Sequence, residues 1–434
     1  MIDHTSSRHD RLAVLRQRDF LCFSIARFLS GAGQTLLQAA LLWHVYALTG
    51  SAWHLGWLGL VRFAPQLMAS LYAGAIADMY DRRRIVMFAQ CVPALCSASL
   101  FVATISGNAS MPLIYGLVVL IALGNAFEAP ARQALLSSVV SEALLPSAIT
   151  LTSTVQSLAF VVGPAVGGML IAYAGGVHAA YAAHAVLVLI ALVSIFVLRP
   201  RPVSLPPRAI SWETMKEGLL FVRSRQPLLG SMTLDMFAVI FGGAQAMLPV
   251  YANDILHVGS QGYGLLTAAL PAGALLISVV MVTMPTVERT GRVLLYSIAA
   301  FGLATMVFGL SRWFPLSLAA YFAAGAADQV SVVMRQTTIQ LATPDHLRGR
   351  VTAVGQIFIG SSNQLGAVES GFVAAATSAM FAVVSGGAGC LAVVALVAAK
   401  MPELRRYTIH HVMDGARRDN EVREAAEAGN STGS

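Results

Sequence analysis

Long apolar stretches separated by short polar turns dominate the chain. An apolar helix of about 20 residues crosses the hydrocarbon core of a bilayer. Twelve stretches reach this length. They run over Phe20–Leu48, Trp53–Ala77, Ile85–Ile105, Leu113–Leu136, Ser147–Ala174, Val177–Leu198, Leu228–Tyr251, Gly262–Pro285, Val293–Leu310, Phe314–Ala342, Val351–Ala376 and Met380–Ala399. The pattern therefore predicts an all-α integral membrane protein with twelve spans.

Composition agrees with lipid as the solvent. Of the 434 residues, 56% are hydrophobic and 11% are charged, against about 25% charged in soluble domains. The net charge of +7 does not indicate nucleic-acid binding, because the basic residues fall at helix ends and not in one patch. Anionic headgroups and the positive-inside rule explain them better.

The basic residues also test the count of spans. If the N-terminus is cytosolic, the even-numbered connections should carry Lys and Arg. They do, at Arg82–Arg84, Arg132, between Arg199 and Arg225, at Arg289 and Arg292, and at Arg348 and Arg350, whereas the opposite side carries Arg312. This distribution predicts twelve spans with both termini in the cytosol.

A long polar link divides the spans into two bundles of six. Prolines open the link and forbid a continued helix, and Ser211–Arg223 then follows helical spacing, which predicts a short amphipathic helix on the cytosolic face. The expected parts are a cytosolic segment 1–19 without a removable signal peptide, a bundle 20–198, a linker 199–226, a bundle 227–400 and a disordered tail 401–434.

The two halves repeat at an offset of 203 residues. The offset takes Arg132 to Arg335, Gly163 to Gly366 and Gly168 to Gly371, and "RQALLSSVVSEALLPSAIT" aligns with "RQTTIQLATPDHLRGRVTA" without a gap. Weak internal symmetry of this kind is typical of secondary transporters, in which a cavity lies between the halves.

The turn from Gly74 to Arg84, "GAIADMYDRRR", closely resembles the signature loop of the major facilitator superfamily, with Asp81 where Gly is usual. Together with "FEAPARQALLSSVV", "VVGPAVGGML" and "TPDHLRGRVTAVGQIFIGSSNQLG", it is similar to the enterobactin-exporter and macrolide-exporter-like, or transmembrane secretion effector, branch. The resemblance implies that spans 1, 4, 7 and 10 line the cavity and that a cytosolic gate includes Gly74, Asp78, Arg82, Arg83, Arg132 and Glu142.

Charged residues inside the spans are the candidates for chemistry, because each costs about 2.5–3.5 kcal/mol on insertion scales. Glu128 and Arg132 are four residues apart and can neutralise each other. Asp328 and Arg335 are seven apart, again on one helix face. A carboxyl group in a medium of low dielectric binds a proton more readily than in water, so we expect Glu128, Asp235 or Asp328 to be the proton-coupling acid.

Other residues have two readings. Arg132 and Arg335 lie toward cytosolic helix ends, where they serve either as gate or cavity residues or as interfacial anchors. Glu128 is either a proton or cation site, beside Pro130, or the structural partner of Arg132. The expected substrate-binding set is Arg27, Gln34, Gln38, Gln245 and Arg335.

The small-residue run in span 5 predicts a thin helix that slides against span 8, and it resembles the Gly-Pro motif of superfamily antiporters. Its residues are Gly163, Pro164, Gly167 and Gly168. A close-packing seam alone would explain the glycines but not the proline, so the motif favours export over import.

These features predict a proton-driven exporter of a small amphipathic molecule, a siderophore or a drug-like compound, in a bacterial inner membrane. An importer of a polar metabolite and a transport-inactive membrane partner or sensor remain as alternatives. Enzyme motifs are absent from the sequence, His44, His178 and His184 are too scattered for a metal site, and we expect no cofactor. The resemblance implies a monomer.

Overall fold

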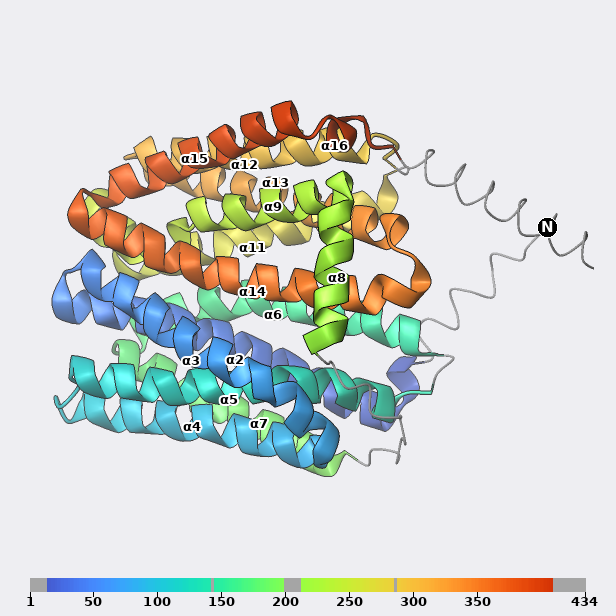
Figure 1. Cartoon of the computed structure of the whole chain (residues 1–434). Coiled ribbons are helices and arrows are strands. Elements are labelled where there is room, and N and C mark those ends of the chain that lie inside the picture. The colour runs from blue at the N-terminus through green and yellow to red at the C-terminus, as the bar shows by residue number, and fades with distance from the viewer. Residues whose placement is uncertain (1–13, 142–143, 199–211, 285–286, 409–434) are drawn as a thin grey trace, which may run out of the picture.

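The computed structural model describes residues 14–141, 144–198, 212–284 and 287–408, and its elements there are helices and turns (Figure 1). The N-terminal half follows a short 3-10 turn, η1 (Val14–Arg16). Its helices are α2 (Arg18–Thr49), α3 (Ala52–Met79), α4 (Arg82–Ile105), α5 (Met111–Val139), α6 (Leu145–Tyr173) and α7 (Val177–Val197).

The C-terminal half begins after α8 (Trp212–Ser224). Its elements are α9 (Gln226–Phe241), η3 (Ala244–Met247), α10 (Leu248–Val250), the π-helical turn η4 (Tyr251–Ile255), α11 (Gly259–Thr283), α12 (Thr290–Leu310), α13 (Phe314–Ala342), α14 (Asp345–Ala376), α15 (Ala379–Lys400) and α16 (Pro402–Arg406). The predicted ends of the apolar stretches agree with these bounds to within three residues, except in the seventh stretch and at the start of α14, which begins at Asp345 and not at Val351.

The seventh apolar stretch, Leu228–Tyr251, lies within a candidate membrane span over Gln226–Ile255, but it is not one uninterrupted helix. Helix α9 ends at Phe241, and the chain passes through Gly242 and Gly243 into short 3-10, α and π turns. At Gly243 an added Cβ would lie 2.5 Å from the Gly366 carbonyl oxygen of α14. The break is therefore packed directly against a neighbouring helix, and a paired glycine makes that approach feasible.

Ten helices in the described part of the chain are long and apolar enough to cross a membrane. Helices α3 and α14 are not among them. They instead pack on each other between the two halves. The chain is thus a multi-pass membrane protein, while the expected total of twelve spans stays a prediction.

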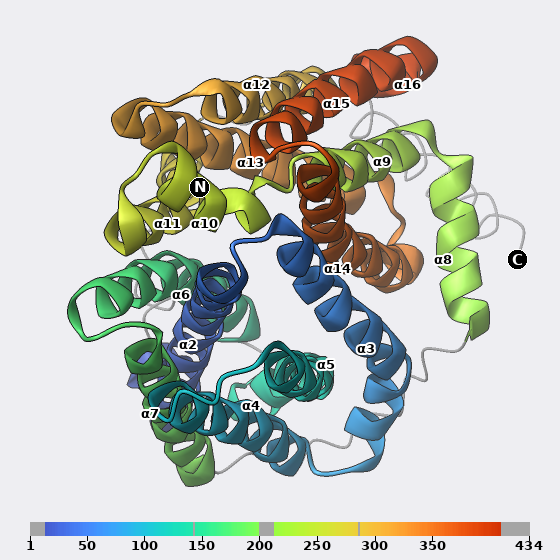
Figure 2. The ribbon, with the colours of Figure 1, turned by 90° about the vertical axis from the view of Figure 1, so that its left-hand side faces the viewer.

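The packing of helices repeats from one half to the other. In the N-terminal half, α2 packs on α6 and α7, α5 packs on α3 and α4, and α4 packs on α7. In the C-terminal half, α9 packs on α14 and α15, α13 packs on α11 and α12, and α12 packs on α15. The two halves lie side by side in Figures 1 and 2 and meet along α3 with α14 and α6 with α11. The sequence repeat at 203 residues is therefore also a repeat of structure.

The two ends of the molecule differ. Helix α8 packs beside α14 near one end of the molecule, here called the α8 end, and Glu217 forms an ion pair of 2.5 Å with Arg350 of α14 (Figure 1). At the other end, here called the far end, the halves are bonded to each other. The Tyr263 hydroxyl donates to the Ala39 carbonyl at 2.8 Å, and the Tyr46 hydroxyl donates to Asp254. The far end is therefore closed in this structure.

Candidate functional site

A polar cluster surrounds Glu128 in the N-terminal half. Its carboxylate pairs with Arg132 and accepts hydrogen bonds from Ser30 of α2 at 3.3 Å and from Gln90 of α4 at 3.1 Å. Arg132 also donates to Ser30 at 2.9 Å. The ion pair expected from the spacing of four residues is confirmed. Three helices thus hold one half-buried carboxylate and one buried guanidinium.

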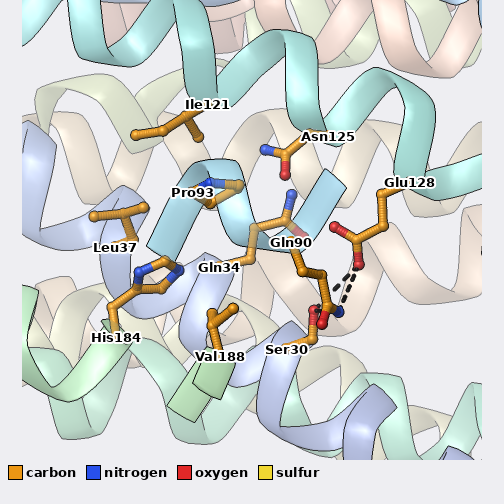
Figure 3. Close-up of a pocket in the computed structure, with 10 residues that line it drawn as sticks. All are labelled: Ser30, Gln34, Leu37, Gln90, Pro93, Ile121, Asn125, Glu128, His184 and Val188. Carbon is orange, nitrogen blue, oxygen red and sulfur yellow. Dashed lines mark hydrogen bonds between the residues drawn. The ribbon is translucent and has the colours of Figure 1, made fainter. Parts of the chain in front are cut away.

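A small cavity adjoins this cluster (Figure 3). Its water-accessible volume is about 20 Å³, which is enough for about one water molecule. Six of its ten lining residues are polar, and the lining comes from α2, α4, α5 and α7: Ser30, Gln34, Leu37, Gln90, Pro93, Ile121, Asn125, Glu128, His184 and Val188. Of the expected substrate-binding residues, Gln34 lines this cavity, and Gln34 is an exposed residue.

Arg27 lies on α2 about one turn nearer to the α8 end of the molecule than Ser30. It shares a second small pocket with Arg132, and the two guanidinium groups are close enough to interact electrostatically. Its Nε is buried with no hydrogen-bond partner among the described residues. Two cations and one carboxylate therefore stand together, which leaves this part of the N-terminal half with an excess of positive charge.

The C-terminal half holds a second buried charge pair. Arg335 of α13 bonds Asp235 of α9 at 2.8 Å, and each side chain is 5% exposed. From the sequence, Arg335 was grouped with Asp328 on its own helix. Asp328 is half-buried and interacts electrostatically with both Asp235 and Arg335, but the ion pair goes to Asp235. A partner one hundred residues away in the sequence leaves no local spacing signal.

The repeat extends to these arginines. Arg132 and Arg335, which correspond at the offset of 203, both reach the first helix of their own half. Arg132 meets Ser30 of α2 there, whereas Arg335 meets Asp235 of α9. Both side chains are buried, so neither extends toward solvent as an interfacial anchor would.

The expected gate is described only in part. Glu142 lies outside the described residues, and of Gly74 and Asp78 the structure describes only their place in α3. Arg83 donates through Nε to the Ile195 carbonyl at 3.1 Å, donates to Phe196, and lies over the Phe196 ring. In this structure Arg83 therefore holds the end of α7 in its own half. Arg82 is half-buried at the start of α4.

Asp81, the departure from the superfamily loop, has a structural role. Its carboxylate accepts the Arg83 backbone N–H at 2.9 Å and so caps α4, which satisfies one of the free donors at a helix start. It also lies 3.7 Å from the Arg84 guanidinium, in an exposed pair.

The small-residue motif of α6 faces two helices. A Cβ added to Gly163 would collide with Thr35 and Ala32 of α2, one added to Gly167 would lie 3.3 Å from Leu36, and Gly168 lies against Gly264 of α11. Gly371 of α14 lies against Gly56 of α3 in the same way. Pro164 stands inside α6 between these contacts. Two glycine-to-glycine contacts thus join the halves at symmetry-related places.

The remaining predicted substrate residues are spread out. Gln38 is half-buried on α2, and Gln245 is exposed in η3, in the broken part of the seventh stretch. Neither lines the cavity beside Glu128.

Sequence reasoning missed several buried polar residues of the N-terminal half. Ser30 and Gln90 bind Glu128, Ser97 bonds His184 at 2.7 Å, and Tyr181 bonds His44 at 2.8 Å. Single polar residues in apolar helices were the available signal, but their pairing across helices is visible only in the structure.

Comparison with known proteins follows this geometry. A family model described as transmembrane secretion effector matches residues 9–421. The chain belongs to this family. This family is a branch of the major facilitator superfamily. It is a family of membrane transporters, not of enzymes.

Two curated relatives are enterobactin exporters. The chain is 26% identical to the enterobactin exporter from Shigella boydii over 395 residues, which cover 89% of this chain and 93% of that exporter. The exporter from an Escherichia coli strain is 25% identical over the same shares of the two chains.

Solved transporters share the fold at low sequence identity. The nucleoside transporter NupG is 13% identical, with a TM-score of 0.68 over 89% of this chain and 99% of NupG. A bacterial homologue of the human lysosomal transporter Spinster, in an inward-facing and unoccupied conformation, is 15% identical, with a TM-score of 0.64 over 91% and 96%. The major facilitator fold predicted from the sequence is confirmed.

Proposed function

We propose that this protein is a proton-driven exporter of a small amphipathic compound, a siderophore or a drug-like molecule, across a bacterial inner membrane. The observation that carries the proposal is a charge-paired carboxylate inside each half: Glu128, half-buried, with Arg132, and Asp235, buried, with Arg335. The α8 end faces the cytosol, in agreement with the distribution of basic residues.

Buried pairs of this kind suit the coupling of protons to transport. Burial favours the neutral form of a carboxyl group, whereas a neighbouring guanidinium favours the charged form. When a proton binds, the carboxyl group loses its charge and the ion pair with the guanidinium is lost. Protonation of Glu128 would release Arg132, and protonation of Asp235 would release Arg335. A freed guanidinium offers a partner to an anionic or hydrogen-bonding group of the substrate.

The enterobactin exporters support export as the direction and a siderophore-like compound as the substrate class. The likeness extends over 89% of this chain. The exposed amides of Gln34 and Gln245, on α2 and on the broken seventh stretch, supply hydrogen-bonding groups for such a compound. Discontinuous helices line substrate sites in many secondary transporters.

Inverted membrane vesicles test the proposal, with enterobactin as the first probe. Accumulation should require an imposed pH gradient. A single charge moved through about 100 mV supplies about 2.3 kcal/mol, which corresponds to a concentration ratio of about fiftyfold.

The coupling acids are tested by neutralising each in turn. At least one of Glu128→Gln, Asp235→Asn and Asp328→Asn should abolish gradient-driven accumulation. Glu217→Gln, in the exposed pair on α8, is the matched control and should leave it unchanged. Gradient-driven accumulation in all three variants would contradict the assignment of the coupling acid, and accumulation indifferent to the gradient in the wild type would contradict proton coupling itself.

A further inference from the structure

Buried polar side chains continue past the Glu128 cavity toward the far end of the N-terminal half. His184 of α7 bonds Ser97 of α4 at 2.7 Å through Nδ1. His44 of α2 bonds the Tyr181 hydroxyl of α7 at 2.8 Å, again through Nδ1. All four residues are buried. Ionisable or hydroxyl-bearing groups are therefore present at two further levels of an otherwise apolar bundle.

These groups follow one another along the helix axes. Tyr181 lies one turn into α7, and His184 lies three residues later on the same face, where side chains of adjacent turns are neighbours. His44 stands five residues before the end of α2 at Thr49, a rise of about 8 Å. His44 is thus near the far end, and Tyr181 and His184 lead from it toward the middle of the bundle.

The cavity connects this series to Glu128. His184 and Glu128 both line it, and the amides of Gln34 and Asn125 lie in the same lining (Figure 3). With room for about one water molecule, the cavity bridges the last histidine and the carboxylate. Arg132 of the same helix pairs with Glu128, and Arg27 of α2 interacts electrostatically with Arg132, while α4 contributes Gln90.

Satisfaction of buried polar groups accounts for each hydrogen bond taken alone. It does not account for their succession on α2 and α7, nor for a polar cavity between the last of them and an ionisable carboxyl group. Both features are what a proton pathway requires.

We propose that His44, Tyr181 and His184 form a proton pathway between the far end of the molecule and Glu128. His44 takes up a proton, the Tyr181 hydroxyl passes one proton on as it accepts another, and the His184 ring binds a proton on one nitrogen and releases one from the other. The released proton crosses the cavity to the Glu128 carboxylate. Each relay group returns to its starting charge, with its ring or hydroxyl proton exchanged, and the net change is the transfer of one proton from the far side to Glu128.

The pathway deepens the proposed function, since it states how the driving proton reaches one coupling acid, but its test needs no substrate. The wild-type protein is reconstituted in vesicles of phosphatidylethanolamine and phosphatidylglycerol. Infrared difference spectra against Glu128→Gln identify the carboxyl band of protonated Glu128. The rate at which this band appears after acidification on the far side of the membrane is the readout.

His184→Leu and Tyr181→Phe should slow this rate by about a hundredfold, the lower range of what a positioned acid–base group contributes. His184→Gln keeps a hydrogen-bonding amide toward Ser97 but cannot carry a proton, so it should be equally slow. The control is His54→Leu, because His54 forms a histidine–tyrosine bond of 2.9 Å to Tyr115, half-buried and outside the series. This control should match the wild type.

A wild-type rate in Tyr181→Phe and in the folded His184 variants would overturn the pathway, and so would a Glu128 band that never responds to pH. A purely structural role would lower the melting temperature of His184→Leu but leave the rate in His184→Gln unchanged. Failure of the proposed function is distinguishable, because enterobactin accumulation would then ignore the pH gradient while the Glu128 band still responded.

Discussion

At the scale of single residues, charge pairing governs the interior of both halves. The Glu128–Arg132 pair was predictable from a spacing of four on one helix. The Asp235–Arg335 pair was not, because its members are far apart in sequence and meet only when α9 and α13 pack. Breaking a buried pair leaves one uncompensated charge, whereas removing both charges does not.

Asp235→Asn should therefore lower the free energy of unfolding by about 3–5 kcal/mol, and Asp235→Asn combined with Arg335→Gln should restore most of it. Thermal denaturation in detergent, followed by size-exclusion chromatography, measures the series. Glu217→Gln removes one charge of an exposed pair and should cost about 1 kcal/mol or less. A double variant less stable than the single one would contradict the account.

At the scale of elements, the apolar pattern was sufficient for most helices. Phe314–Ala342 was predicted with the bounds it has, and the other helix ends differ by a few residues. The break at Gly242–Gly243 inside the seventh stretch was not predicted, because apolarity does not record the close approach of α14 at Gly243. The site was less predictable for the same reason: Ser30, Gln90 and His184 acquire their roles from neighbours on other helices.

The glycine contacts between the halves allow a prediction at this scale. Overpacking a tight contact costs about 1–3 kcal/mol. Gly168→Val or Gly371→Val should therefore disfavour the far-end-closed state by about tenfold or more.

The readout is maleimide labelling of Ala39→Cys, a position that is buried in the closed state, in a background without the four native cysteines. Labelling should rise in both glycine variants. Gly360→Val on α14, where an added Cβ meets no atom within 4 Å, is the control. Equal labelling of Gly371→Val and Gly360→Val would refute the role of the contact.

At the scale of the whole molecule, closure of the far end depends on few bonds between the halves. The Tyr46 hydroxyl of α2 donates to the Asp254 carboxylate of η4, and Tyr263 of α11 reaches back to α2. Hydrogen bonds to charged groups contribute about 1.5–3 kcal/mol. The Tyr46–Asp254 bond is thus strong enough to set which opening predominates.

Tyr46→Phe keeps the ring but loses this bond, so it should raise the far-end-open population by about tenfold or more. Spin labels at Gly107 and Thr377, in far-end turns of the two halves, should show a longer distance in pulsed electron paramagnetic resonance. Tyr251→Phe removes a bond of 2.8 Å to the Gly309 carbonyl within one half and should leave the distance unchanged. An unaltered distance in Tyr46→Phe would contradict the account.

The glycine contacts also bear on the thermodynamics of alternation. Where main chain meets main chain, as at Gly168 with Gly264 and Gly56 with Gly371, no rotamers are frozen when the surfaces join, and little side-chain entropy is lost. Joining and parting at these contacts then differ little in entropy. In a transporter whose halves meet through such contacts, the few kcal/mol that a membrane potential provides are enough to drive the change from one state to the other.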